Sequence, residues 1–147
     1  MMCMRLTYCF ALALLPAMAA CHNEPTAPAP AVVEGLLGDR ITLAVGQTAT
    51  VAGTPLSVRF ARVLSEGRCP SDVACIWQGS AEYVLEVRTA GAIADSLRVL
   101  QMSTYATGRF AQMGAYRYET VELAPYPRNG QIDLSRYQLT LRVLAAN

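Results

Sequence analysis

Cysteine carries most of the chemistry available to this 147-residue chain, because the other reactive residue types are scarce. There is no lysine, and the one histidine, His22, lies near the N-terminus. A Ser-His or Cys-His nucleophile system therefore cannot be built in the rest of the chain, and a Ser-Lys pair is excluded. Neither a G-x-S-x-G motif nor a phosphate-cradling glycine loop occurs. We expect no enzymatic activity and no cofactor.

A pair of carboxylates is the one catalytic device that the composition leaves open, as in glycoside hydrolysis. Most of the acidic residues occupy the polar positions of alternating sequences, which favours a solvated surface over an active site. A cryptic carboxylate hydrolase is therefore an alternative to a non-catalytic role. Its acidic candidates are Glu66, Asp72, Glu82, Glu86, Glu119, Glu122 and Asp133.

Cys21 follows a segment typical of a bacterial lipoprotein signal peptide, residues 1–20. Arg5 is the only charge before the apolar run Leu6–Leu15, which is shorter than the about 20 residues of a membrane span. Small residues precede Cys21, and Met18 stands where these signals usually have leucine. We expect Cys21 to be lipidated as the first residue of the mature protein. An ordinary secretory signal cut near Ala20 is the alternative.

Residues 21–37 form a predicted tether between the lipid and the folded domain, residues 38–147. Prolines among small residues cannot build a core and favour extended polyproline geometry. His22, rather than aspartate, follows Cys21, so the common inner-membrane retention signal is missing. We expect a protein of the bacterial cell envelope, anchored by lipid to the outer membrane and facing the periplasm.

Cys69 and Cys75 remain after Cys3 and Cys9 are removed and Cys21 is lipidated, and an oxidising envelope would pair them. The closed loop is short, so we expect a stabilisation of about 2 kcal/mol. A structural disulfide is favoured over a redox role, because thiol-disulfide catalysts typically use C-x-x-C. A zinc site would need two further ligands, so we expect no metal.

Apolar and polar residues alternate through most of the domain, which predicts strands. Leu56, Val58 and Phe60 share one face, but the alternation fails at Arg62 and resumes at Val63, which indicates a β-bulge. Residues 90–97 are the only ambiguous place for a helix. Seven to nine short strands separated by glycine turns predict an all-β antiparallel sandwich with immunoglobulin-like packing. The other apolar faces are Ile41/Leu43/Val45, Ala81/Tyr83/Leu85/Val87, Leu97/Val99, Val121/Leu123 and Tyr137/Leu139/Leu141/Val143.

The segment from Glu66 to Ala81 contains the densest motif, Arg-Cys-Pro-x4-Cys-x-Trp-x-Gly. It resembles the R-C-P-x4-C-x-W-x-G core of small, largely uncharacterised bacterial lipoproteins and secreted β-proteins. The residues that match are Arg68, Cys69, Pro70, Cys75, Trp77 and Gly79. The resemblance covers roughly residues 43–89 and implies an envelope β-domain. It transfers no catalytic residue.

Trp77, the only tryptophan, directly follows the cysteine pair. We expect it to plug one end of the core, with its indole N–H bonded to a backbone carbonyl. The alternative is a tryptophan that stacks on a ligand or anchors a partner, with Arg68 and Gln78 as polar neighbours. Gly79 is expected to permit a close backbone approach or a bulge.

Tyrosines and arginines gather in a second candidate binding segment after Met102. It contains Tyr105, Tyr116, Tyr118 and Tyr126, with Arg109 and Arg117 between them. Both residue types are favoured at interfaces, although sheet tyrosines with one wet end would give the same pattern. Residues 125–130 form a predicted rigid loop that either presents a surface or only connects strands.

The sequence thus predicts a lipid-anchored envelope protein with a binding or structural role. Its partner would be an envelope protein or a cell-wall glycan, besides the membrane reached through the lipid. The scattered, nearly balanced charge gives no basic patch for nucleic acid. An inhibitor-like module is the alternative: the disulfide would pre-organise the loop 69–75, with Ser71 and Asp72, for insertion into a hydrolase cleft.

Overall fold

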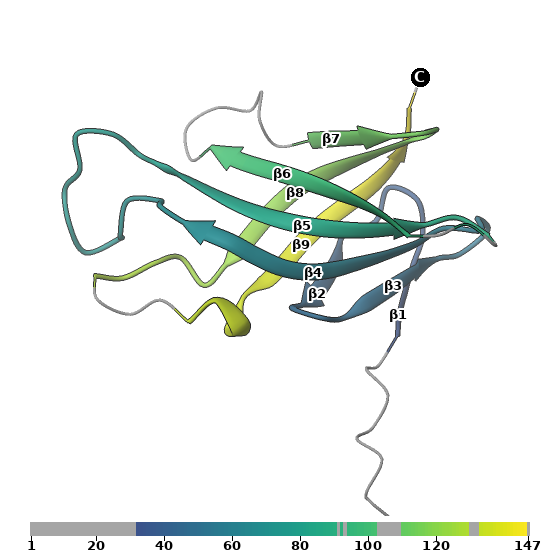
Figure 1. The fold of residues 1–147 in the computed structure, drawn as a ribbon, viewed down its shortest axis with the longest axis horizontal. Coiled ribbons are helices and arrows are strands. Elements are labelled where there is room, and N and C mark those ends of the chain that lie inside the picture. Colours follow the sequence, from purple (N-terminus) through teal and green to yellow (C-terminus); the bar gives the residue numbers. More distant parts are fainter. Residues whose placement is uncertain (1–31, 91, 93, 103–109, 130–132, 147) are drawn as a thin grey trace, which may run out of the picture.

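Two stacked β-sheets make up the part of the chain that the computed structural model describes, residues 32–90, 92, 94–102, 110–129 and 133–146 (Figure 1). The signal peptide, Cys21 and most of the tether lie outside these residues. The strands are β1 (Val33–Gly35), β2 (Ile41–Ala44), β3 (Thr48–Val51), β4 (Ser57–Glu66), β5 (Ser80–Arg88), β6 (Asp95–Met102), β7 (Phe110–Met113), β8 (Tyr116–Ala124) and β9 (Gln138–Ala145).

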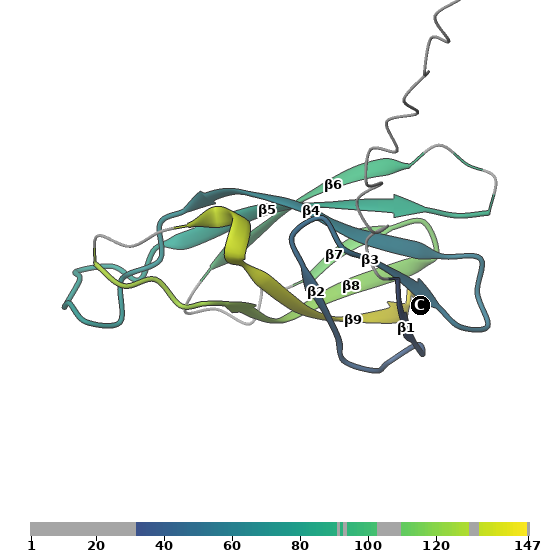
Figure 2. The ribbon, with the colours of Figure 1, turned by 90° about the horizontal axis from the view of Figure 1, so that it is seen from below.

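The strand order is β1-β3-β4-β5-β6 in one sheet and β2-β9-β8-β7 in the other. Every neighbouring pair is antiparallel except β1 and β3. Figure 2 shows the two layers edge-on. The predicted antiparallel sandwich is confirmed. The fold includes β1, which lies before the predicted domain start at Gly38, because the backbone of Val33–Gly35 pairs with that of β3.

The core lies between the two sheets and is filled by the residues whose alternation predicted strands. Side chains two residues apart on a strand share a face, so each strand turns one apolar row inward. Phe60 and Tyr83 meet edge to face in this core, with ring centroids 5.8 Å apart. The buried rows are Ile41/Leu43, Ala49/Val51, Val58/Phe60, Ala81/Tyr83/Leu85/Val87 and Tyr137/Leu139/Leu141/Val143.

The predicted β-bulge in β4 is confirmed. Its pairing with β5 shifts between Phe60 and Arg62, and this extra residue returns Val63 to the buried face. The pairing of β4 shifts again between Val63 and Ser65. A further shift, in β8 between Thr120 and Glu122, was not expected. It places the buried Thr120 and Leu123 inward and leaves Val121 partly exposed, although the sequence analysis assigned Val121 to the apolar face.

The ambiguous segment 90–97 contributes the beginning of β6. The helical structure in the described residues is the short 3-10 helix η2 (Leu134–Arg136), whose first turn Asp133 caps by accepting a hydrogen bond from Ser135 N. The segment 125–129 after β8 and the β4–β5 loop lie side by side at one end of the sandwich (Figures 1 and 2). This end holds the R-C-P-x4-C-x-W-x-G motif.

Candidate binding loop at one end of the sandwich

Residues 67–79 form the loop between β4 and β5, which we call the motif loop. Two backbone hydrogen bonds close its base, from Gly67 N to Ser80 O (2.8 Å) and from Cys69 N to Gln78 O (2.9 Å). Gly79 has φ +67°, and a Cβ there would lie 1.8 Å from Gly67 O. The glycine of the motif is therefore required by a close backbone approach, as the sequence analysis expected.

A disulfide between Cys69 and Cys75 narrows the loop above this base, which confirms the predicted pairing. The two Cα atoms are 6.0 Å apart, within the usual range for a disulfide. Because both sulfur atoms are used, neither cysteine is available as a thiol while the bond is intact.

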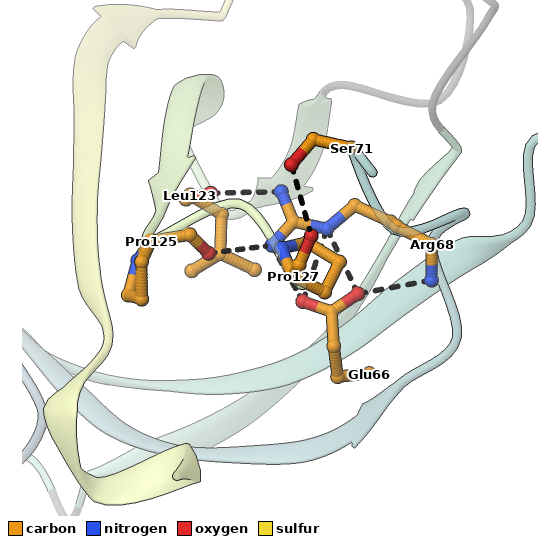
Figure 3. Close-up of polar contacts among 6 residues, drawn as sticks. All are labelled: Glu66, Arg68, Ser71, Leu123, Pro125 and Pro127. Carbon is orange, nitrogen blue, oxygen red and sulfur yellow. Dashed lines mark hydrogen bonds and ion pairs between the residues drawn. The ribbon is translucent and has the colours of Figure 1, made fainter. Parts of the chain in front are cut away.

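Arg68 and Glu66 form a buried ion pair beneath the loop (Figure 3). Their side chains are 3% and 1% exposed. Arg68 Nε donates to Glu66 Oε1 (2.9 Å) and Oε2 (3.0 Å), Arg68 Nη2 donates to Oε2, and the backbone N of Arg68 donates to Oε1 (2.9 Å). This fork-like arrangement satisfies both charges inside the protein.

The guanidinium of Arg68 also ties the motif loop to the end of β8. Nη1 donates to Leu123 O (2.8 Å) and Nη2 donates to Pro125 O (3.2 Å). The guanidinium carbon lies 4.7 Å from the centre of the Tyr126 ring, at cation–π distance. One buried side chain thus joins two segments that are far apart in the sequence.

Burial and charge act in opposite directions on the pKa of Arg68. Burial disfavours the charged guanidinium of Arg68, but its hydrogen bonds and charge interaction with Glu66 raise its pKa overall. Burial, followed by interactions with Glu66, raises the pKa of Tyr137 to about 12. Tyr137 is therefore neutral beside the ion pair at neutral pH.

The first half of the motif loop is pinned to the segment after β8. Ser71 N donates to Pro127 O (3.0 Å), and the Ser71 hydroxyl lies 3.5 Å from the same oxygen (Figure 3). Asn129 N donates to Asp72 Oδ1 (2.9 Å). Ser71 and Asp72 thus form hydrogen bonds within the protein, to the segment after β8.

The second half of the motif loop presents apolar side chains to solvent. Ile76 is fully exposed, Trp77 is 67% exposed and Val73 is 42% exposed. We call these three residues the apolar tip. The expectation that Trp77 plugs the core is wrong, because the loop projects beyond the sheets. Arg68, Tyr137 and Pro127, in contrast, are buried at this end.

The predicted binding residues do not share one surface. Arg68 is buried in its ion pair, so it does not lie on the surface with the exposed Trp77 and Gln78. Asp72 is exposed, but its carboxylate accepts a hydrogen bond from Asn129 N. Tyr118 lies in the core, where burial raises its pKa to about 12.

The rest of the tyrosine segment is also dispersed. Tyr116 is partly buried against the core, and Tyr126 is exposed beside Arg68. Arg117 lies over the ring of Phe110, at 3.8 Å from its centre. Tyr105 and Arg109 lie outside the described residues. The tyrosines of β8 therefore follow the alternation of a sheet.

Several of the candidate carboxylates are engaged by arginines. The pairs are Glu86–Arg59 (2.9 Å), Glu82–Arg98 (2.6 Å), Glu119–Arg142 (3.9 Å) and the buried Glu66–Arg68. Within the described part of the chain, no group of three or more His, Cys, Asp or Glu side chains is placed to hold a metal ion. The same residues contain no helix long and apolar enough to cross a membrane.

Two residues of this site were missed by sequence reasoning. Glu66 was assigned to the surface, although its spacing of two from Arg68 was a signal that the side chains share a side of the chain. Ile76 lies in a loop with no periodicity, so nothing in the pattern indicated its exposure.

No family model matches the chain, and comparisons with curated proteins and with solved structures give no match either. The function is therefore argued from the site.

Proposed function

We propose that this protein is a lipid-anchored, non-catalytic binding module of the bacterial envelope, and that the motif loop is its binding element. The observation that carries the proposal is the exposed apolar tip on a loop fixed by a disulfide and a buried ion pair. Exposed large apolar side chains gathered at one place are typical of interaction sites.

The contacts below the loop support this role because they limit its motion before binding. The disulfide, the Arg68 hydrogen bonds and the two bonds to residues 127 and 129 each fix a different part of the loop. A binding element that is already ordered loses less conformational entropy when its partner arrives. Trp77 is also a residue type that often dominates interface energetics.

The lipid anchor rests on the sequence around Cys21, which lies outside the described residues. An anchored module is held near other envelope components, so a small contact surface suffices for binding at high local concentration. The engaged carboxylates and the lack of lysine favour binding over catalysis.

The inhibitor-like alternative relies on the loop 69–75 and its residues Ser71 and Asp72. Both residues bond to the segment after β8, and Val73 is the only residue of the apolar tip within this loop. The apolar tip is the better contact surface. Replacing both Ser71 and Asp72 by alanine is thus expected to leave the partner contact largely intact, whereas the inhibitor-like role predicts its loss.

Site-specific photo-crosslinking in the native host tests the proposal. A photoreactive amino acid at Ile76 is expected to give a specific adduct with an envelope component, whether lipid or macromolecule. The matched control carries the same group at Leu100, another exposed apolar residue, on β6. Equal labelling from both positions would show that the motif loop is not the binding element.

A further inference from the structure

No charged residue belongs to the apolar tip itself. Between Cys69 and Gly79 the only charged residue is Asp72, whose carboxylate accepts a hydrogen bond from Asn129 N. The exposed Arg128 directly precedes Asn129, so the two charges near the tip have opposite signs. Arg68 below is buried and paired with Glu66. Burial of the three side chains of the apolar tip therefore takes no charge of their own out of water.

The side chains at this end also suit the boundary between water and lipid. Ile76 and Val73 are aliphatic, and Trp77 adds an exposed indole with one polar N–H. Tyr126, on the neighbouring segment, is a second exposed aromatic residue. Tryptophan and tyrosine are enriched at the level of lipid headgroups, because each has an apolar body and a polar group.

The position of β1 allows the tip and the lipid anchor to reach one bilayer. Val33 pairs with Ala49, which pairs with Val58 of β4. Glu66, at the base of the motif loop, follows Val58 by eight residues, a distance of about 26 Å along the strand. The apolar tip lies beyond this base. The twelve residues from Cys21 to Val33 span about 37 Å when extended.

The direction of β1 assists this geometry. β4 runs toward the motif loop, β3 is antiparallel to β4, and β1 is parallel to β3. β1 therefore runs away from the motif loop, and its first residue, Val33, is the end of the strand nearer that loop. A tilt of the domain shortens the height that the tether must cover.

We infer that the apolar tip inserts into the interface of the same bilayer that holds the Cys21 lipid, so that the domain lies against its own membrane. This inference rests on the proposed lipid anchor and adds the partner of the motif loop. A short loop binds a bilayer weakly alone, but the anchor supplies the high local concentration that makes insertion effective.

Trp77 provides the test, because it is the only tryptophan and its fluorescence reports on the tip alone. The full mature lipidated chain is reconstituted into phosphatidylethanolamine–phosphatidylglycerol vesicles containing lipids brominated at defined acyl positions. Shallow bromines are expected to quench Trp77 strongly, and deep bromines several-fold less. Ile76→Asp is expected to reduce shallow quenching several-fold, whereas the matched control Leu100→Asp leaves it unchanged.

Each contrary result has a separate meaning. Unquenched Trp77 in a chain whose mass shows the lipid would overturn the membrane contact and leave the anchored binding module standing. A protein adduct from the photoreactive group at position 76 in the host would also overturn the membrane contact and leave the anchored binding module standing. A mass without lipid would overturn both the proposed function and this inference.

Discussion

Arg68 and Glu66 carry opposite charges inside the end of the sandwich, where each charge depends on the other. With both present, the hydrogen bonds of the pair replace lost hydration. With one removed, the remaining charge would be buried without a partner. The pair is therefore expected to fix the motif loop more than to raise overall stability.

Removing one partner of this pair should be costly. Glu66→Gln is expected to destabilise the protein by about 3 kcal/mol, because the Arg68 charge stays buried. The matched control is Glu86→Gln, which breaks the exposed pair with Arg59 and should cost less than about 1 kcal/mol. Urea unfolding followed by circular dichroism measures both. An equal loss of unfolding free energy in the two variants would contradict a buried charge pair.

A methyl group added at Gly79 tests the close backbone approach at the base of the motif loop. Gly79→Ala is expected to cost well over about 1 kcal/mol, because it adds a clash with Gly67 O to the strain of a positive φ. Gly53→Ala is the control, since Gly53 has φ +76° with nothing within 4 Å of the added Cβ. Similar thermal midpoints for the two variants would show that the loop base can relax.

Single residues of the site were harder to predict than the elements that hold them. The motif identified the place, but Arg68 was considered only as a polar neighbour of Trp77 in a binding site, and its pairing with Glu66 was not predicted. Trp77 was predicted to plug the core because it is the only tryptophan and directly follows the cysteine pair. Hydropathy cannot distinguish an apolar side chain that fills a core from one that is presented to a partner.

The elements themselves followed from alternation. The bulge in β4 was predicted because the parity slip separates two buried residues, Phe60 and Val63, by three positions. The shift in β8 was missed because Val121 and Leu123 by themselves satisfy an unbroken alternation. The inward row of β8 is Tyr118 and Thr120 before the shift and Leu123 after it.

The disulfide fixes the motif loop, and the sandwich fold is expected to form without it. Replacing Cys69 and Cys75 by serine is expected to lower the free energy of unfolding by about 2 kcal/mol, because the closed loop is short. The sandwich should persist, since its core lies between the sheets. Circular dichroism measures the fold, and proteolysis the loop. Complete unfolding of the variant would contradict this division.

The described part of the molecule buries three tyrosines, Tyr83, Tyr118 and Tyr137. Burial raises the pKa of Tyr118 and of Tyr137 to about 12, and raises that of Tyr83, whose hydroxyl is hydrogen-bonded to Thr120. In the unfolded chain these groups titrate near about pH 10. The stability due to the neutral tyrosines is therefore complete below that pH and is lost as the pH rises toward 12.

Alkaline unfolding tests this arrangement. The urea midpoint is expected to fall as the pH rises above about 10, and phenolate absorbance should show a group of tyrosines that titrates late. Tyr118→Phe, which removes a buried hydroxyl with no hydrogen-bond partner among the described residues, should weaken the fall. An unchanged midpoint up to pH 11.5 would contradict the buried tyrosines.

The central claim joins the lipid anchor to the fixed motif loop, and intact mass tests both. The protein is taken from the membrane fraction of its native host and weighed before and after reduction and alkylation. We predict a chain that begins at Cys21, carries acyl mass, and exposes two alkylatable cysteines, Cys69 and Cys75, only after reduction. An unlipidated chain, or thiols that react before reduction, would contradict the account.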